Sequence, residues 1–232
     1  MGERAWRGVC RAAAAAQAAE EARQAWPHVT GALPFDYRWE HVTQVVGLAQ
    51  RLGRATGADA EVVEAAAWLH DVRKELPSHG QAGAAAARVL LAGTDFPPEK
   101  VGAVADAIRL HVGLYRSANA PLEPLEAAVL WDADKLSKLG AQAVMLTLST
   151  AAVQGMDLVQ RWRYITEFVE TVLSRTVTSM NTRPGRRMAE RRYRTMLSVL
   201  SLWAREMREM GVEFEGEFTF EIPSDYDGMS EE

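Results

Sequence analysis

Apolar residues recur every three to four positions along most of the chain, which is the spacing of helices that bury one face. Glycine and proline residues divide this pattern into segments of ordinary helix length. The pattern therefore predicts an all-α protein. Its helices are expected over about residues 3–25, 39–54, 59–74, 79–92, 97–111, 123–139, 141–154, 157–180 and 185–210.

The helical pattern gives way to a different one near the C-terminus. Residues 213–222 alternate acidic and apolar side chains, which predicts either a short strand or a loose segment, and residues 223–232 are acidic and expected to be disordered. The rest of the chain shows no internal repeat and no long linker. We therefore expect a helix and loop over residues 1–35, one helical domain over 36–212 and an acidic tail over 213–232.

The composition limits the classes of function. Of the 232 residues, 48% are hydrophobic, so the chain can bury a sizeable core, yet no stretch is apolar for the roughly 18 residues of a membrane span. The formal net charge of −5 gives no overall attraction for polyanions. Cys10 is the only cysteine, which excludes an intrachain disulfide and suits a cytoplasmic protein.

Histidines are few, and most of them fall within the predicted helices. Four of the five lie between residues 41 and 111, and Asp71 directly follows one of them. Neutral imidazole and carboxylate groups together suit zinc, iron or manganese. The four histidines are His41, His70, His79 and His111.

The polar residues of this set share helix faces with apolar residues. Val104, Ile108 and His111 stand at positions i, i+4 and i+7, and His70 and Asp134 follow apolar residues at similar spacings. Each side chain is therefore predicted to face the core, where a polar group needs a partner. A single buried histidine is more often hydrogen-bonded to the backbone, but one metal centre satisfies the whole set together.

Asp132 and Asp134 compete for the last ligand position. They are two residues apart, so on a helix their side chains point about 200° from each other and cannot both face one ion. Asp134 shares the stripe of Ala127 and Leu130, which favours it as the ligand. Asp132 is then expected to hold the other ring nitrogen of a liganding histidine.

Four segments resemble, in their order, the HD superfamily of metal-dependent phosphohydrolases. They are RWEHVTQVVGLAQRL, AAAWLHDVRKELP, AIRLHVG and LEAAVLWDADKLSKLGA, and the likeness covers about residues 36–145. The resemblance implies an HD-domain helical bundle with its metal core over 36–145, further C-terminal helices over 146–212 and an extra N-terminal helix.

The resemblance also implies a ligand set and a reaction. One or two divalent ions are expected, with Mn, Fe, Mg, Zn, Co and Ni all left open. The substrate would be a small phosphorylated molecule such as a nucleotide, hydrolysed by a metal-activated water. The residues after Asp134 and the presence of Arg73, where many members have glycine, prevent naming one substrate. The implied ligands are His41, His70, Asp71 and Asp134 for a first ion, and Asp71, His79 and His111 where a second is bound.

Basic residues near these segments are expected to bind the phosphate. Lys74 stands four residues after His70 and therefore projects from the same side of the helix. We expect Asp71 and Lys74 to take part in catalysis. The residues expected to bind the substrate are Lys74, Lys135, Arg38 and Arg116.

Other functions remain open at this stage. Six arginines lie between residues 183 and 194, but aromatic side chains among them are limited to Tyr193, so we favour a solvated helix face over a nucleic-acid surface. One alternative is a di-iron oxygenase, which would use the same ligands. Another is a non-catalytic helical regulatory module, in which the metal is structural and has no open coordination position. The sequence also leaves open a homo-oligomer.

Overall fold

The computed structural model describes residues 5–116 and 121–213, and this part of the chain contains helices and no β-strand. The all-α prediction is therefore confirmed. The alternating segment and acidic tail predicted beyond residue 213 lie outside the described residues. The first helices are α1 (Trp6–Ala25), α2 (Tyr37–Thr56), α3 (Ala60–Leu69), α4 (His79–Leu91), the 3₁₀ turn η1 (Pro98–Lys100), α5 (Val101–Leu110) and α6 (Leu125–Leu136).

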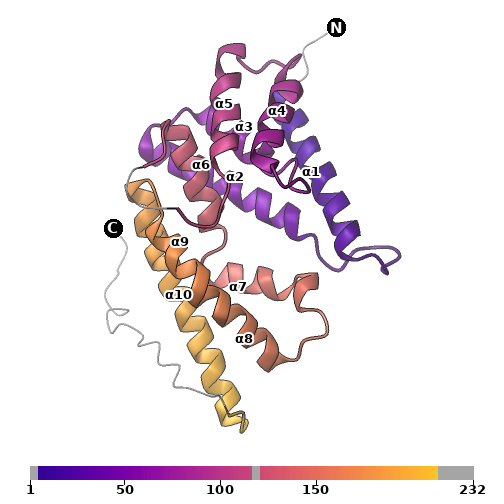
Figure 1. Cartoon of the computed structure of the whole chain (residues 1–232), viewed down its shortest axis with the longest axis vertical. Helices are drawn as coiled ribbons and strands as arrows, with labels where there is room; N and C mark the ends of the chain where they lie inside the picture. The colour runs from indigo at the N-terminus through magenta and orange to yellow at the C-terminus, as the bar shows by residue number, and fades with distance from the viewer. Residues whose placement is uncertain (1–4, 117–120, 214–232) are drawn as a thin grey trace.

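The C-terminal helices form a second group. Figure 1 shows α1–α6 together in one half of the molecule, and α7–α9 beside the long α10 in the other half. Helix α10 also packs against α2 and α6, so it joins the two halves. The second group consists of α7 (Ala141–Leu148), the 3₁₀ turn η2 (Ala151–Val153), α8 (Leu158–Phe168), the π-helical turn η3 (Val169–Leu173), α9 (Ser174–Thr178) and α10 (Arg183–Glu209).

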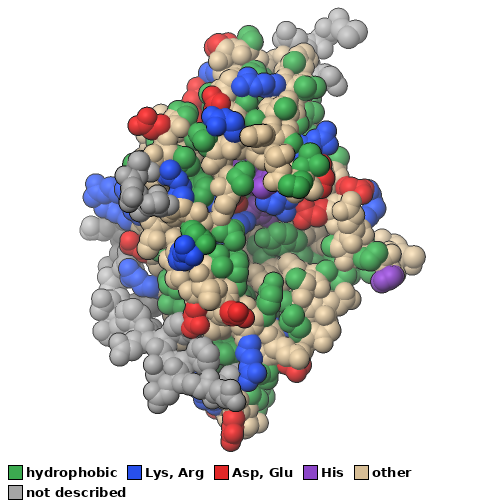
Figure 2. All heavy atoms as spheres, viewed as in Figure 1, with side chains coloured by type: hydrophobic (Ala, Val, Ile, Leu, Met, Phe, Trp, Pro, Cys, Tyr) green, Lys and Arg blue, Asp and Glu red, His purple; other side chains and the backbone are tan. Residues whose placement is uncertain are grey.

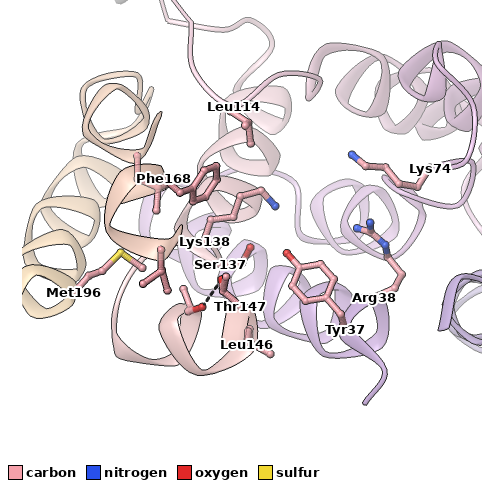
Figure 3. Close-up of a pocket in the computed structure, with 13 residues that line it drawn as sticks. Tyr37, Arg38, Lys74, Leu114, Ser137, Lys138, Leu146, Thr147, Phe168 and Met196 are labelled. Carbon is pink, nitrogen blue, oxygen red and sulfur yellow. Dashed lines mark hydrogen bonds between the residues drawn. The ribbon is translucent and has the colours of Figure 1, made fainter. Parts of the chain in front are cut away.

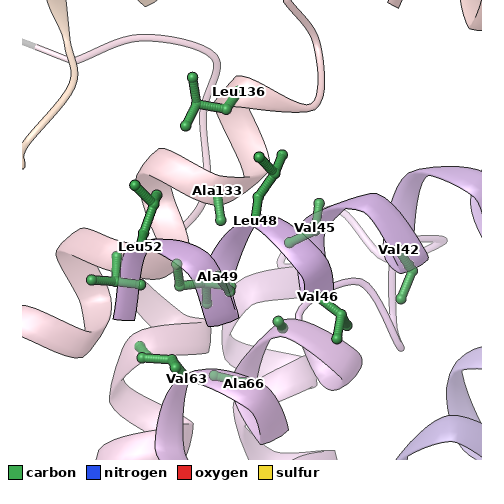
Figure 4. Close-up of a cluster of buried hydrophobic side chains, with 14 of the residues drawn as sticks. Val42, Val45, Val46, Leu48, Ala49, Leu52, Val63, Ala66, Ala133 and Leu136 are labelled. Carbon is green, nitrogen blue, oxygen red and sulfur yellow. The ribbon is translucent and has the colours of Figure 1, made fainter. Parts of the chain in front are cut away.

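The core of the first half lies between α2, α3 and α6 (Figure 4). Val45 and Leu52 of α2 are fully buried, and Val63 of α3 and Ala133 of α6 lie in the same cluster. Burial of one such aliphatic side chain contributes about 1.5–3 kcal/mol. Helix α6 is buried from Ala127 to Leu136, so even its polar residues lie inside the protein.

Helix ends place the polar residues that matter for the site. Asp36 accepts a hydrogen bond from the Trp39 amide at the start of α2, which sets His41 in the first turns of that helix. Ser78 precedes α4, and its side chain makes no capping hydrogen bond to that helix. Helix α4 packs closely against α5 and the residues that follow it. A Cβ added at Gly80 would lie 2.5 Å from the Val112 side chain, which is too close.

Several predicted helices are shorter or less regular than expected. The helix expected over residues 141–154 ends at Leu148, before the separate turn η2. Helix α3 ends at Leu69, and residues 70–75 form consecutive turns rather than continuing to residue 74. The predicted helix over 157–180 contains the wider π-helical turn Val169–Leu173. Within the described part, no helix combines the length and hydropathy that a bilayer crossing needs.

Candidate metal centre

Four helices bring five of the candidate ligands to one place. His41 comes from the start of α2, His70 and Asp71 follow the end of α3, His111 follows α5, and Asp134 lies in α6. All five are buried. Figure 2 shows a hollow in the middle of one face, in which histidine, basic and acidic side chains are visible.

Three ligand atoms form the first cluster. His41 Nε2 lies 3.2 Å from His70 Nε2, and both nitrogens lie within 3.6 Å of Asp71 Oδ2. These atoms are close enough to one another to share one ion. Asp134 Oδ1 lies 3.4 Å from His41 Nε2, so this carboxylate stands beside the cluster.

A second cluster uses the other oxygen of Asp71. His111 Nε2 lies 3.5 Å from Asp71 Oδ1, and the His79 and His111 ring centroids are 5.3 Å apart. Asp71, His79 and His111 therefore also offer three ligand atoms within reach of one ion. His79 is half-buried at the start of α4, whereas the other two residues are buried. Asp71 is common to both clusters.

Hydrogen bonds at the back of the rings orient their free nitrogens. His70 Nδ1 faces the Ala67 carbonyl at 2.8 Å, and His111 Nδ1 faces a carbonyl in the same way. A carbonyl can only accept, so Nδ1 carries a proton, and in the neutral tautomer this leaves the lone pair on Nε2. Ser137 donates to the Asp134 carbonyl and therefore accepts from His41 Nδ1. Three Nε2 lone pairs thus point into the centre.

The electrostatics of the centre favour a bound cation. Burial lowers the pKa of His41 to about 3 and that of His70 to about 4, so both rings are neutral at pH 7. Asp71 Oδ1, His111 Nε2 and Asp134 Oδ1 are buried and make no hydrogen bond to the described residues. Such acceptors are costly without a partner. A divalent ion in the second cluster would satisfy Asp71 Oδ1 and His111 Nε2, and one in the first cluster would satisfy Asp134 Oδ1. The donor set therefore fits a metal ion.

The two carboxylates keep their charge although they are buried. Burial alone would raise the pKa of Asp71, but the permanently charged Arg38 guanidinium in contact with it helps to hold that pKa well below the usual range. Burial likewise opposes ionisation of Asp134, and the adjacent lysines outweigh it. Two buried negative charges at pH 7 therefore face the three free imidazole nitrogens.

Asp132 has a different role from the predicted one. Its carboxylate accepts hydrogen bonds from the amides of Asn181 and Thr182 at 2.7 and 2.8 Å, and from both of their side chains. Because both oxygens are occupied, the expectation that Asp132 holds a histidine nitrogen is wrong. Burial raises its pKa, and these hydrogen bonds partly offset that effect. Asp132 fixes the start of α10 against α6.

The prediction that Lys135 binds the substrate is also wrong. Its side chain is fully buried, and its ammonium donates to the His111 carbonyl at 2.8 Å and to Asp134. It also lies over the Trp131 ring. A substrate could not reach it. Lys138, one turn further along, takes the open position instead, with Nζ 3.3 Å from Asp134 Oδ1. The spacing of four residues between Asp134 and Lys138 is the sequence feature that could have indicated this role of Lys138.

The other two predicted phosphate ligands of the first half do lie at the centre. Arg38 contacts Asp71 and is held from behind by Glu21 of α1, at 2.7 Å. Lys74 Nζ lies 3.4 Å from Asp71 Oδ1 and 3.3 Å from His79 Nε2. Lys74 is partly exposed, so it stands at the entrance of the site.

The remaining basic candidates lie elsewhere. Arg116 donates to Asn181 Oδ1 at 2.9 Å and is not among the residues that line the adjacent cavity. Within the arginine run, Arg183, Arg187 and Arg191 lie exposed on α10, beside Arg51 of α2. The run is therefore largely a solvated helix face.

A cavity of about 280 Å³ adjoins the metal centre. Figure 3 shows Arg38, Lys74 and Tyr37 on one side of it, and Phe168 and Met196 on the other. The two halves of the molecule therefore both contribute walls. The lining residues of the second half come from α7, α8, η3 and α10.

Several solved structures have a similar fold. YpgQ of Bacillus subtilis, in complex with ADP, has a TM-score of 0.57 at 24% identity over 82% of this chain and 97% of that chain. An HD-superfamily hydrolase from Bacillus thuringiensis has a TM-score of 0.57 at 22% identity over 84% and 95% of the two chains. A predicted HD superfamily hydrolase from an uncultured Thermotogales bacterium gives 0.54 at 22%, over 87% and 91%. These likenesses show a shared fold.

The search of curated proteins found no match. A family model, described as the HD domain, matches residues 38–139. The matched segment begins at Arg38, three residues before His41, and ends just after Lys138. It therefore contains every candidate ligand described above. Residues 38–139 thus match the HD domain, with α1 before the matched segment and α7–α10 after it.

Proposed function

We propose that this protein is a metal-dependent phosphohydrolase that cleaves a phosphate ester of a small molecule. The observation that carries the proposal is the set of orphaned buried acceptors, Asp71 Oδ1, His111 Nε2 and Asp134 Oδ1, beside a cavity lined with cations. The ADP complex of YpgQ supports a phosphorylated ligand at this fold. A divalent ion bound there would lower the pKa of a bound water to about 7 and make hydroxide available.

The residues of this chain have separate parts in the proposed reaction. His41, His70, Asp71 and Asp134 hold the first ion, and Asp71 with His79 and His111 holds a second. Ser137 and the backbone carbonyls fix the histidine tautomers, so that Nε2 faces the ion.

The cations of the cavity bind the phosphoryl group. Lys74 and Lys138 are each within 3.4 Å of a candidate carboxylate ligand, so their ammonium groups face the place where phosphate oxygens would lie. They offset the negative charge of the phosphate and of the departing group. Glu21 keeps the Arg38 guanidinium at the same place.

Metal analysis of the full chain tests the site. Protein purified without chelator should contain at least one transition metal ion per chain. The variant with both His70→Ala and Asp71→Ala should lose it, whereas His28→Ala, in the exposed loop before α2, should not. Unchanged metal content in the double variant would contradict the assignment.

A phosphate-release screen tests the reaction. Nucleotides and phosphomonoesters should be compared on metal-loaded protein, with the double variant as the control for contaminating phosphatase. Release by the wild type alone supports hydrolysis. Metal binding without release from any ester, combined with consumption of oxygen by the ferrous protein, would replace this proposal with an oxygenase.

A further inference from the structure

The cavity beside the metal centre has two chemically different ends. Arg38, Lys74 and Lys138 bring positive charge to the end next to Asp71 and Asp134. The opposite end is made by the C-terminal helices, which lie outside the matched HD segment (Figure 3). Its lining residues are Ala143, Leu146, Ile165, Phe168, Leu173 and Met196.

The far end is a firm apolar wall. Ile165, Leu173 and Met196 are each only 1% exposed, so packing holds them in place. Phe168 is half-buried and faces the cavity from the end of α8. An apolar group that enters this end would leave water without displacing any charge from the metal side.

The two hydroxyl groups near this wall already donate hydrogen bonds to backbone carbonyls. Thr147 donates to the Ala143 carbonyl at 2.9 Å, and Ser137 donates to the Asp134 carbonyl at 2.6 Å while it accepts from His41. The Tyr37 ring stacks parallel to His41, at the cationic end. With their protons engaged, Thr147 and Ser137 can only accept further hydrogen bonds, and the six apolar residues of the wall offer none, so this end has few partners for the polar groups of a sugar or a base.

We propose that the substrate is a phosphate monoester whose organic group is apolar, with its phosphate at the cationic end and its organic group against Phe168, Ile165 and Met196. This inference rests on the proposed function, since it places the phosphate beside the metal centre. A ribose or base against this apolar wall would leave most of its polar groups without partners, which disfavours nucleotides relative to apolar esters.

A series of n-alkylphosphonates from methyl to pentyl tests the inference by binding, without any catalytic step. The full chain with Mn²⁺ should bind each longer member about fourfold more tightly, because each added methylene is removed from water. The gain should stop when the cavity of about 280 Å³ is filled. AMP should bind more weakly than pentylphosphonate. Calorimetry measures all of these affinities.

Phe168→Ala should flatten the series while leaving methylphosphonate unchanged, since the substitution removes apolar wall and no charge. Tyr164→Ala, one turn earlier on α8 and exposed, is the matched control and should keep the full dependence on chain length. Should Phe168→Ala fail to fold, the wild-type series still decides the question.

The outcomes separate this inference from the proposed function. Equal affinity for all phosphonates, or tighter binding of AMP than of pentylphosphonate, would overturn the inference even if the protein hydrolyses phosphate esters. A clear dependence on chain length without phosphate release from the corresponding alkyl phosphates would support the apolar chamber and reject the hydrolase.

Discussion

Residues only a few positions apart in α6 and the turn after it have unrelated roles, because a helix turns by about 100° per residue. Asp134 faces the histidines, whereas Asp132 faces the start of α10. Lys138 stands one turn after Asp134 and lines the cavity, whereas Lys135 is enclosed against Trp131. The charge of a residue in this helix therefore says little about its role until its direction is known.

Lys138→Met is expected to reduce turnover and to leave the metal bound. The ammonium would stabilise charge on the phosphate, but a lysine is flexible, so we expect a loss of about tenfold to a hundredfold, at or below the 10²–10³ typical of a rigid donor. Arg191→Met, an exposed cation of α10, is the control. Turnover and metal content should be measured on the same preparations, and a variant as fast as wild type would remove Lys138 from the site.

Asp132→Asn is expected to destabilise the protein without changing its metal content. The carboxylate accepts four hydrogen bonds from Asn181 and Thr182, and an amide would direct an NH₂ group at some of these donors. A loss of about 1–3 kcal/mol in the free energy of unfolding should follow in urea titrations. Asp134→Ala should have the opposite profile, with loss of metal. Loss of metal from the Asp132 variant alone would reverse the two assignments.

At the scale of elements, the apolar period was sufficient to predict the helices, because each helix buries one face against its neighbours. The period could not predict where α3 ends or where the π-helical turn begins, since both depend on contacts with other helices. The same limit applies to the site. His70, His111 and Asp134 were recognisable from their apolar neighbours, but the enclosure of Lys135 depends on His111 and on Trp131, from another turn of α6.

Close packing of α10 on α6 gives a test at this scale. A Cβ at Gly185 would lie 2.2 Å from Asp132 Oδ2, which is part of a fixed buried network. Gly185→Ala should therefore destabilise the protein by about 1–3 kcal/mol. Gly47 lies in the exposed face of α2 with no atom within 4 Å of such a Cβ. Gly47→Ala should instead stabilise by about 0.5–1 kcal/mol. Thermal unfolding of both variants makes the comparison, and equal effects would contradict it.

At the scale of the whole molecule, the two groups of helices divide the work. The HD segment supplies the candidate ligands and the cations, while α7–α10 close the cavity with apolar side chains. Helix α1, outside the matched segment, holds Arg38 through Glu21. This arrangement buries neutral histidines and charged aspartates together at the centre. The stability of the metal-free protein is therefore expected to depend on pH.

His41 and His70 determine the sign of that dependence. Their pKa values are lowered to about 3 and about 4 in the folded protein, whereas an unfolded histidine has a pKa of about 6.5. Below pH 6.5 the unfolded chain therefore binds more protons than the folded chain, and the free energy of unfolding falls as the pH is lowered. Between pH 7 and pH 5 the loss should be about 2 kcal/mol for each histidine.

Urea unfolding of metal-free protein at pH 7 and pH 5 measures this loss. The window lies above the range in which ordinary carboxylates titrate, and Asp71 and Asp134, whose pKa values are lowered further, stay ionised throughout it. His41→Gln should lose less stability over the window than wild type, because glutamine binds no proton in either state. His28→Gln, in the exposed loop, should behave as wild type. Equal stability at the two pH values would mean that the His41 and His70 rings are not enclosed as described. The argument that this centre needs a cation would then fail too.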